Sequence, residues 1–217
     1  MIRAFLAVEL SQELRTKLAT LQQELKQRIE SEMKRDMRIS WVQPASLHLT
    51  IKFLGDTDEQ MIDPLRAALE QAIGNQRAVN VPLERLGAFP RPQNPRVLWV
   101  GPSESWEKGA EAKRIAEIHG TIEQVCDGFS FLRETRPFSP HLTLARIKTG
   151  ERHVGVALAQ GGVLDRPLSL GSLAVESVAL MKSELKPTGS VYTKLWGVRL
   201  TCSSCLFGLF GLSGLFG

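Results

Sequence analysis

The sequence predicts an α+β fold in which the strands form antiparallel sheets. Short runs typical of strands alternate along the chain with amphipathic segments that are typical of helices. No predicted strand is followed by a glycine-rich phosphate-binding loop, because the chain contains neither GxGxxG nor GxxxxGK[ST]. This absence disfavours the doubly wound parallel sheets of common nucleotide-binding proteins.

The N-terminal segments predict a buried strand followed by a long helix. Residues 2–8 form an apolar run, and Ser11 is a suitable N-cap for the helix that follows. Leucines recur in this helix at the spacing of one packed face, namely at Leu14, Leu18, Leu21 and Leu25. The charged run 30–38 predicts the frayed end of the helix and a surface loop.

The remaining elements follow from the same patterns. Residues 39–42 and 47–54 predict strands on either side of a turn at 44–46, and residues 58–73 predict a helix. Further strands are expected at 79–86, 97–100, 142–147, 172–183 and 192–200, a helix at 107–126, and a short helix or strand at 154–160.

Composition and cysteine usage describe an ordinary globular protein. The 27 Lys and Arg residues exceed the 23 Asp and Glu residues by four, which permits an anionic ligand without requiring one. The apolar run 4–8 is too short for the core of a signal peptide, so a cytoplasmic location is expected. Cys126, Cys202 and Cys205 predict no disulfide framework, and Cys202-x-x-Cys205 lacks the second ligand pair that a zinc site needs.

Residues 201–217 form a Leu/Phe/Gly-rich tail. It is too short and too rich in glycine to span a bilayer as a helix, so no membrane association is expected. A poorly ordered terminus is favoured over a surface for membrane or partner docking.

Two segments carry nearly the same motif, His-Leu-Thr followed by an apolar residue, in strand-like surroundings. Alternation along a strand places His48 and Thr50 on one face, and it places His141 and Thr143 on one face of the second strand. The opposite faces are expected to hold the apolar residues Leu47, Leu49, Ile51 and Phe53 in the first segment and Leu142 and Leu144 in the second.

This pair of motifs suits hydrolysis of a phosphodiester. One imidazole can deprotonate water while the other protonates the leaving oxygen, and the threonine hydroxyls can donate hydrogen bonds to the phosphoryl oxygens. No metal or cofactor is required. A zinc site at His48 and His141 would need a carboxylate or a third histidine on the same strands, and none is present.

A single histidine on a strand is more often a structural residue, but the repeated motif argues against that interpretation for His48 and His141. The other two histidines, His119 and His153, lack a threonine partner and are expected at the surface.

The motifs and several longer stretches resemble the 2H phosphoesterase superfamily, in particular its bacterial RNA 2′,3′-cyclic phosphodiesterase branch, also called 2′-5′ RNA ligases. The resemblance extends from residue 1 to about residue 200, and the tail departs from it. The matching stretches are RAFLA at 3–7, WVQP at 41–44, LHLTIKFLG at 47–55, LGAFP at 86–90, RVLWVG at 96–101 and RPFSPHLTLAR at 136–146.

The resemblance implies a bilobed domain over residues 1–200, with two related lobes of antiparallel sheet plus helices around a central cleft. It implies that His48 donates a proton to the leaving 3′ oxygen and that His141 accepts one from water. Thr50 and Thr143 would hold the phosphate. The substrate would be an RNA or oligonucleotide with a 2′,3′-cyclic phosphate end, the product a 2′-phosphate, and the enzyme a monomer.

Two further site residues follow from the resemblance less directly. Arg146 lies at the wrong parity to share a face with His141, so it reaches the phosphate only if the strand twists or bulges; otherwise it is an exposed residue at a strand end. Tyr192 lies where the family often has an aromatic residue that contacts substrate, and packing alone would also explain it.

Three alternative functions use the same site. The chain could cleave 2′-5′ linked oligonucleotides, it could join RNA ends through a 2′-5′ bond, or it could bind RNA without catalysis. The last is disfavoured because a protein that only binds RNA has no need of both histidines.

Overall fold

The computed structural model of the chain describes residues 1–30, 37–186 and 189–201. The predicted loop at 31–36 and the tail with Cys202 and Cys205 lie outside these residues. The helices are α1 Gln12–Glu30, α2 Ile62–Ile73, α3 Ala110–Gly128 and α4 Glu151–Gln160. The strands are β1 Ile2–Glu9, β2 Arg38–Trp41, β3 His48–Thr57, β4 Val79–Pro82, β5 Arg85–Phe89, β6 Val97–Gly101, β7 Leu142–Thr149, β8 Ser172–Val175, β9 Ser177–Lys186 and β10 Gly189–Arg199.

The predicted α+β class is confirmed, with one strand divided differently. Residues 79–86 form two strands, because β4 pairs with β8 in a small sheet while β5 pairs with β6 in the main sheet. The chain crosses between the sheets after Pro82, which has no N–H to continue the ladder. Leu83 N–H still donates to Gly171 O (2.9 Å) in the small sheet, whereas Glu84 N–H donates to Gly101 O (2.9 Å) in the main sheet.

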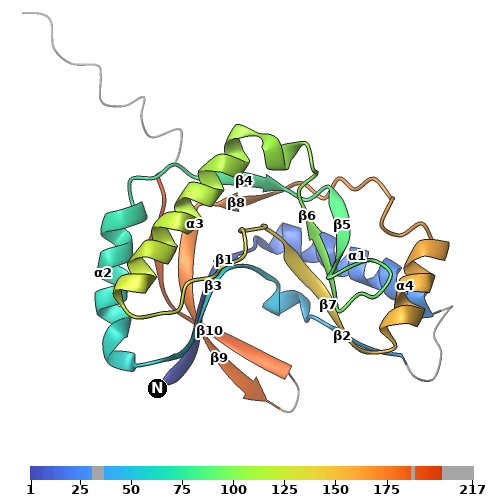
Figure 1. The fold of residues 1–217 in the computed structure, drawn as a ribbon, viewed down its shortest axis with the longest axis horizontal. Helices are drawn as coiled ribbons and strands as arrows, with labels where there is room; N and C mark the ends of the chain where they lie inside the picture. The colour runs from blue at the N-terminus through green and yellow to red at the C-terminus, as the bar shows by residue number, and fades with distance from the viewer. Residues whose placement is uncertain (31–36, 187–188, 202–217) are drawn as a thin grey trace, which may run out of the picture.

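Helix α1 begins and packs as its sequence predicts. The Ser11 hydroxyl accepts a hydrogen bond from Leu14 N–H (3.2 Å), which satisfies one of the free donors of the first turn. The four leucines at helical spacing are all buried, with exposed fractions of 5% or less. The segment at 154–160, which the sequence left open, is the helix α4, and it packs against α1 (Figure 1).

The main sheet is antiparallel throughout and consists of two halves. Its strand order is β10-β9-β1-β3-β7-β6-β5, and β2 pairs with β7. Strands β1 and β3 pair along eight residues, but β3 and β7 are joined only at Leu49 and Leu142. The sheet therefore divides at this junction into a first half, β10-β9-β1-β3, and a second half, β7-β6-β5 with β2.

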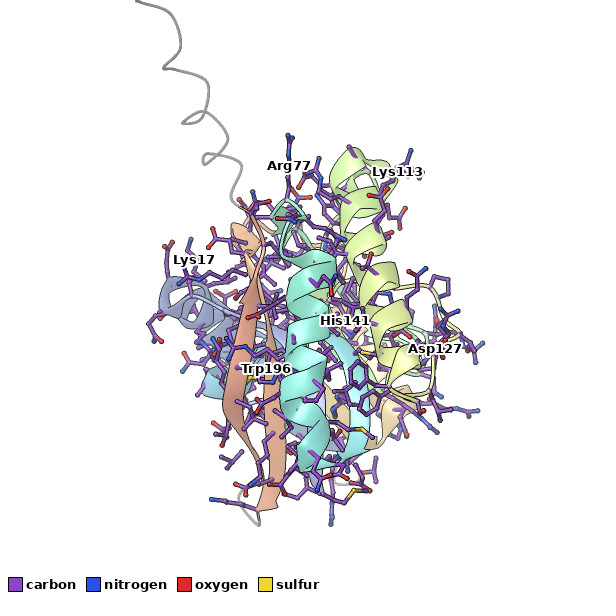
Figure 2. The ribbon with its side chains drawn as sticks, turned by 90° about the vertical axis from the view of Figure 1, so that its left-hand side faces the viewer. Lys17, Arg77, Lys113, Asp127, His141 and Trp196 are labelled. Carbon is purple, nitrogen blue, oxygen red and sulfur yellow. The ribbon has the colours of Figure 1, made fainter. Side chains whose placement is uncertain are left out.

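Helices α2 and α3 pack against one another (Figure 1). Trp196 of β10 lies beside α2 (Figure 2), and its indole N–H donates to Ile62 O (3.2 Å). Ala4, Leu6 and Val8 of the central strand β1 belong to the buried core, which leaves the alternate residues of β1 for the opposite face of the sheet. Among the described residues, no helix is long and apolar enough to cross a membrane.

Candidate active site

The two His-Leu-Thr motifs meet where the halves of the sheet join. Leu49 directly follows His48, Leu142 directly follows His141, and these two leucines form the antiparallel pair between β3 and β7. Equivalent residues that pair in antiparallel strands are related by a local twofold axis. The junction therefore brings the predicted residues His48, Thr50, His141 and Thr143 together from segments far apart in the sequence.

Both imidazoles are held in the same way. His48 Nδ1 lies 2.8 Å from Ser46 O, and His141 Nδ1 lies 2.8 Å from Ser139 O. A backbone carbonyl only accepts hydrogen bonds, so each Nδ1 carries a proton. Each Nε2 is then left to exchange protons with a substrate, as an acceptor in the neutral ring and as a donor in the imidazolium.

A β-bulge follows each threonine at the same place in the motif. Leu6 pairs with Lys52 and Ala7 with Thr50, so Ile51 is the extra residue in β3. In the second half, Leu98 pairs with Ala145 and Trp99 with Thr143, so Leu144 is the extra residue in β7. A bulge reverses the parity of the residues beyond it.

The bulges move two side chains to the face that carries the histidines. Ile51 and Lys52 are both buried, and Phe53 beyond them is 67% exposed, so the expectation that Phe53 lies with the apolar residues is wrong. Leu144 and Ala145 are likewise both buried, and Arg146 beyond them is exposed. The bulge that Arg146 needs in order to face the site is therefore present.

Aromatic rings surround His48 in the first half of the sheet. Tyr192 presents its edge to His48, with ring centroids 5.1 Å apart and planes at 88°. Phe5 contacts both rings, with its centroid 4.8 Å from His48 and 5.0 Å from Tyr192. Tyr192 therefore lies at the site rather than in the core, although it also packs against Phe5.

A second aromatic group borders His141. Phe89 lies edge-on to His141 at 5.1 Å and stacks on Trp99, also at 5.1 Å. The Trp99 indole covers Gly87, its partner across the strands, where a Cβ atom would lie only 2.1 Å from the ring. Glycine is thus required at position 87 for the indole to lie in this place.

The surroundings lower the pKa of both histidines. For His141, burial is the main cause, and the positive charge of Arg146 adds to it, while the Ser139 carbonyl acts in the opposite direction. For His48, burial again lowers the pKa most, the Ser46 carbonyl raises it, and both Arg146 and Arg15 lower it. The charge of Arg146 therefore lies near enough to act on both imidazoles.

Arg15 supports the turn before His48. Its guanidinium donates to the carbonyls of Leu10 (3.2 Å), Pro44 (3.2 Å) and Ala45. Pro44 and Ala45 begin the 3₁₀ turn Pro44–Ser46, whose last carbonyl holds His48. No motif in the sequence indicates this role of Arg15, because it depends on a contact between α1 and a distant turn.

The sequence predicted His119 and His153 at the surface, but neither residue is fully exposed. His119 on α3 has a side chain only 12% exposed, and it stacks on Phe138. His153 on α4 is half-buried. In the described part of the chain, no group of three or more His, Cys, Asp or Glu side chains is arranged to hold a metal ion.

Two relatives of the chain share the name RNA 2′,3′-cyclic phosphodiesterase. An RNA 2′,3′-cyclic phosphodiesterase of Methanothermobacter thermautotrophicus is 32% identical over 199 residues, which cover 92% of this chain and 99% of that protein. A protein of the same name from Aquifex aeolicus is 30% identical over 78% of this chain and 86% of its own length.

Solved structures agree with this fold. The structure of Escherichia coli LigT complexed with 3′-AMP superposes with a TM-score of 0.67 at 22% identity, covering 92% of this chain and 98% of LigT. A Thermus thermophilus structure superposes with a TM-score of 0.66 at 29% identity over the same shares of the two chains. The LigT-like phosphoesterase family model matches residues 8–99 and 108–192, so the chain belongs to the LigT-like phosphoesterases of the 2H type.

Proposed function

We propose that this enzyme hydrolyses 2′,3′-cyclic phosphate ends of RNA to 2′-phosphates, with His48 and His141 acting on opposite sides of one phosphorus atom. The observation that carries the proposal is the pairing of Leu49 with Leu142, which relates the two histidines by a twofold axis. In-line displacement at phosphorus needs a base on the side of the attacking water and an acid on the side of the leaving oxygen.

The proton transfers balance with these two groups alone. Neutral His141 takes a proton from water through Nε2 as the water oxygen bonds to phosphorus. The bond between phosphorus and the 3′ oxygen breaks, and His48 imidazolium gives its Nε2 proton to that oxygen. The product carries a 2′-phosphate and a 3′ hydroxyl, and solvent then returns each histidine to its starting state.

The charge that develops on the phosphoryl oxygens also has donors in the chain. Thr50 and Thr143 lie on the same faces as the histidines, and the bulge in β7 adds the guanidinium of Arg146. Charge-assisted hydrogen bonds from such groups can replace the electrostatic role that a metal ion plays in other phosphoesterases. This supports a reaction that needs no metal.

The difference between the halves supports the assignment of acid and base. Exposed Phe53 offers a nucleobase a surface for stacking on the side of His48, with Tyr192 beside it. Arg146 lies in the second half, with His141. A nucleoside over the first half directs its own ribose oxygens toward His48, and the leaving oxygen is one of them. His48 is then the proton donor.

The alternatives from the sequence remain open to the same site. Cleavage of 2′-5′ linked oligonucleotides and formation of a 2′-5′ bond use the same proton transfers on a different substrate or in the reverse direction. No observation favours either one over hydrolysis. The shared name of the relatives supports the cyclic phosphodiesterase.

A single assay tests this function. The full chain is incubated with an RNA that ends in a 2′,3′-cyclic phosphate, with and without EDTA, and the product ends are identified by ³¹P NMR. We expect 2′-phosphate at equal rates in both arms, and a rate lower by on the order of 10²–10⁴ with His48→Ala. Complete loss of activity in EDTA that a divalent metal restores, or a 3′-phosphate product, would contradict the proposal. A 2′-5′ linked dinucleotide in a parallel arm tests the first alternative.

A further inference from the structure

A buried polar cluster beneath the site has no part in the proposed proton transfers. Lys52 and Glu123 form an ion pair with side chains only 3% and 10% exposed. The Lys52 ammonium donates to Glu123 Oε1 (2.9 Å), to Glu123 Oε2 (2.8 Å) and to Leu132 O (2.7 Å), so all three of its protons are used. Two charges are thus buried in a fixed and fully hydrogen-bonded geometry, which is costly unless every partner stays in place.

His119 lies one helical turn before Glu123 on α3 and belongs to the same cluster. Its Nε2 is 3.6 Å from Glu123 Oε1, and the backbone of Ile51 lies near enough to the ring to raise the pKa of His119. On its other side the ring stacks on Phe138, with centroids 4.4 Å apart and planes at 17°. Burial is the largest cause of the lowered pKa of His119 and favours the neutral ring, while Glu123 and the Ile51 backbone act in the opposite direction.

His119 and Glu123 each contact both the strand of the first motif and the loop that leads to the second motif. On the side of β3, the His119 ring lies beside the backbone of Ile51, the bulge residue directly after Thr50, and Glu123 accepts a hydrogen bond from Lys52, the next residue. The second set of contacts is to the loop that leads to His141. Phe138, which stacks on His119, is followed at once by Ser139, whose carbonyl holds His141 Nδ1.

Glu123 also reaches this loop, because its Oε2 accepts a hydrogen bond from Glu134 N–H (3.2 Å). Figure 1 shows the loop turning back along α3 before it enters β7. Apart from the pair Leu49–Leu142, strands β3 and β7 share no ladder. The relative placement of the two motifs must therefore depend on contacts outside the sheet.

We propose that His119 and Glu123 are positioning residues that fix the second motif, through Ser139, relative to the bulge of the first. His119 then affects the reaction only through the position of the second motif, because it touches neither the substrate nor the reacting atoms. The kinetic consequence of this proposal rests on the proposed function, but the structural consequence does not. Misplacement of a catalytic group by about 1 Å can lower a rate by roughly a hundredfold.

Three substitutions at position 119 separate the two contacts. His119→Phe keeps the stack on Phe138 and loses the polar contacts of the imidazole with Glu123 and the Ile51 backbone, whereas His119→Gln keeps a polar side chain and loses the stack. His119→Ala loses both. The matched control is His153→Ala, which removes a half-buried histidine from α4, away from the cluster. All rates are measured on the full chain, well below the temperature at which each variant begins to unfold.

We expect kcat on a 2′,3′-cyclic nucleotide to fall about tenfold to a hundredfold in His119→Ala, with KM roughly unchanged, because geometry and not binding is lost. The Phe and Gln variants should lie between His119→Ala and the wild type. His153→Ala should keep the wild-type kcat. If His119→Ala does not fold, the comparison of the Phe and Gln variants with the wild type decides the question.

The second readout is the ¹H–¹⁵N spectrum of the histidine rings, which does not depend on activity. We expect the Nδ1 signal of His141 to shift or to exchange faster with water in His119→Ala and Glu123→Gln, and to stay unchanged in His153→Ala. Folded variants with the wild-type kcat, or with an unchanged His141 signal, would overturn the positioning role. If the wild-type enzyme does not cleave cyclic phosphates, the proposed function fails, and the spectrum still decides whether α3 holds His141.

Discussion

The two halves of the sheet share a histidine, a threonine and a bulge, but they differ at the next residue on the same face. Strand β3 places the exposed ring of Phe53 there, and β7 places the guanidinium of Arg146. The shared part accounts for a symmetric pair of proton carriers. The difference makes the site asymmetric, because an apolar surface lies on the side of His48 and a positive charge lies on the side of His141.

The shared part is tested by removing each histidine. His48→Ala and His141→Ala should each lower kcat/KM by on the order of 10²–10⁴, since each variant loses one proton-transfer step. The double variant should be far less than multiplicatively worse, because both groups act on one transition state. Steady-state kinetics on a cyclic nucleotide measures this. A folded variant with full activity would exclude the substituted residue from the reaction.

The charged side of the comparison predicts the next largest effect. Arg146→Gln should cost about 1.5–3 kcal/mol of transition-state stabilisation, which is about 10- to 150-fold in kcat/KM, because a charge-assisted bond to the phosphoryl oxygens is lost. Arg96→Gln is the control for loss of a surface charge, because the Arg96 side chain is exposed and its Nε makes only a long ion pair with Glu151 Oε1 (3.9 Å). Equal activity of Arg146→Gln and Arg96→Gln would remove Arg146 from the site.

The apolar side predicts an effect on binding. Phe53→Ala should raise KM for a cyclic nucleotide by the worth of one stacked base, about 1–3 kcal/mol by alanine substitution, with kcat nearly unchanged. Val156→Ala is the control, because Val156 is also an exposed apolar residue (53%) but lies on α4. An unchanged KM in Phe53→Ala would mean that the base does not lie over the first half, and the argument for His48 as the donor would lose its support.

The sequence predicted the elements that local patterns determine. The run 2–8, the N-cap at Ser11 and the two His-Leu-Thr strands depend on alternation and on side chains close in the chain. The bulges after Thr50 and Thr143 could not be read, because a bulge depends on pairing with strands β1 and β6. For this reason Phe53 was assigned to the wrong face and Arg146 was left between two interpretations.

The roles of His119 and Arg15 could not be predicted from the sequence for a related reason. A histidine in a helical segment gives no sign of the loop that will cover it, and the burial of His119 depends on Phe138 and Glu123, which come together only in the folded chain. Arg15 likewise contacts a turn about thirty residues away in the sequence. Residues that act through tertiary contacts carry no motif of their own.

The smallest predicted effect is a shift in the pH dependence of kcat/KM, and it shows which histidine accounts for which limb of the profile. With one imidazole protonated and the other neutral, kcat/KM should be bell-shaped. Arg146 lowers the pKa of both histidines, whereas Arg15 lowers that of His48 alone. Loss of a neighbouring positive charge favours the imidazolium, so the pKa of His48 should rise in Arg15→Met.

If His48 is the acid, the alkaline limb moves to higher pH in Arg15→Met and the acidic limb stays in place. Arg15→Lys keeps the charge and should leave both limbs unchanged, which controls for the lost bonds to Pro44 and Ala45. Arg146→Gln should move both limbs upward. Pre-steady-state or steady-state rates from pH 5 to 9 would show these shifts. Movement of the acidic limb alone in Arg15→Met would make His48 the base, exchange the roles of the two histidines, and predict the 3′-phosphate as product.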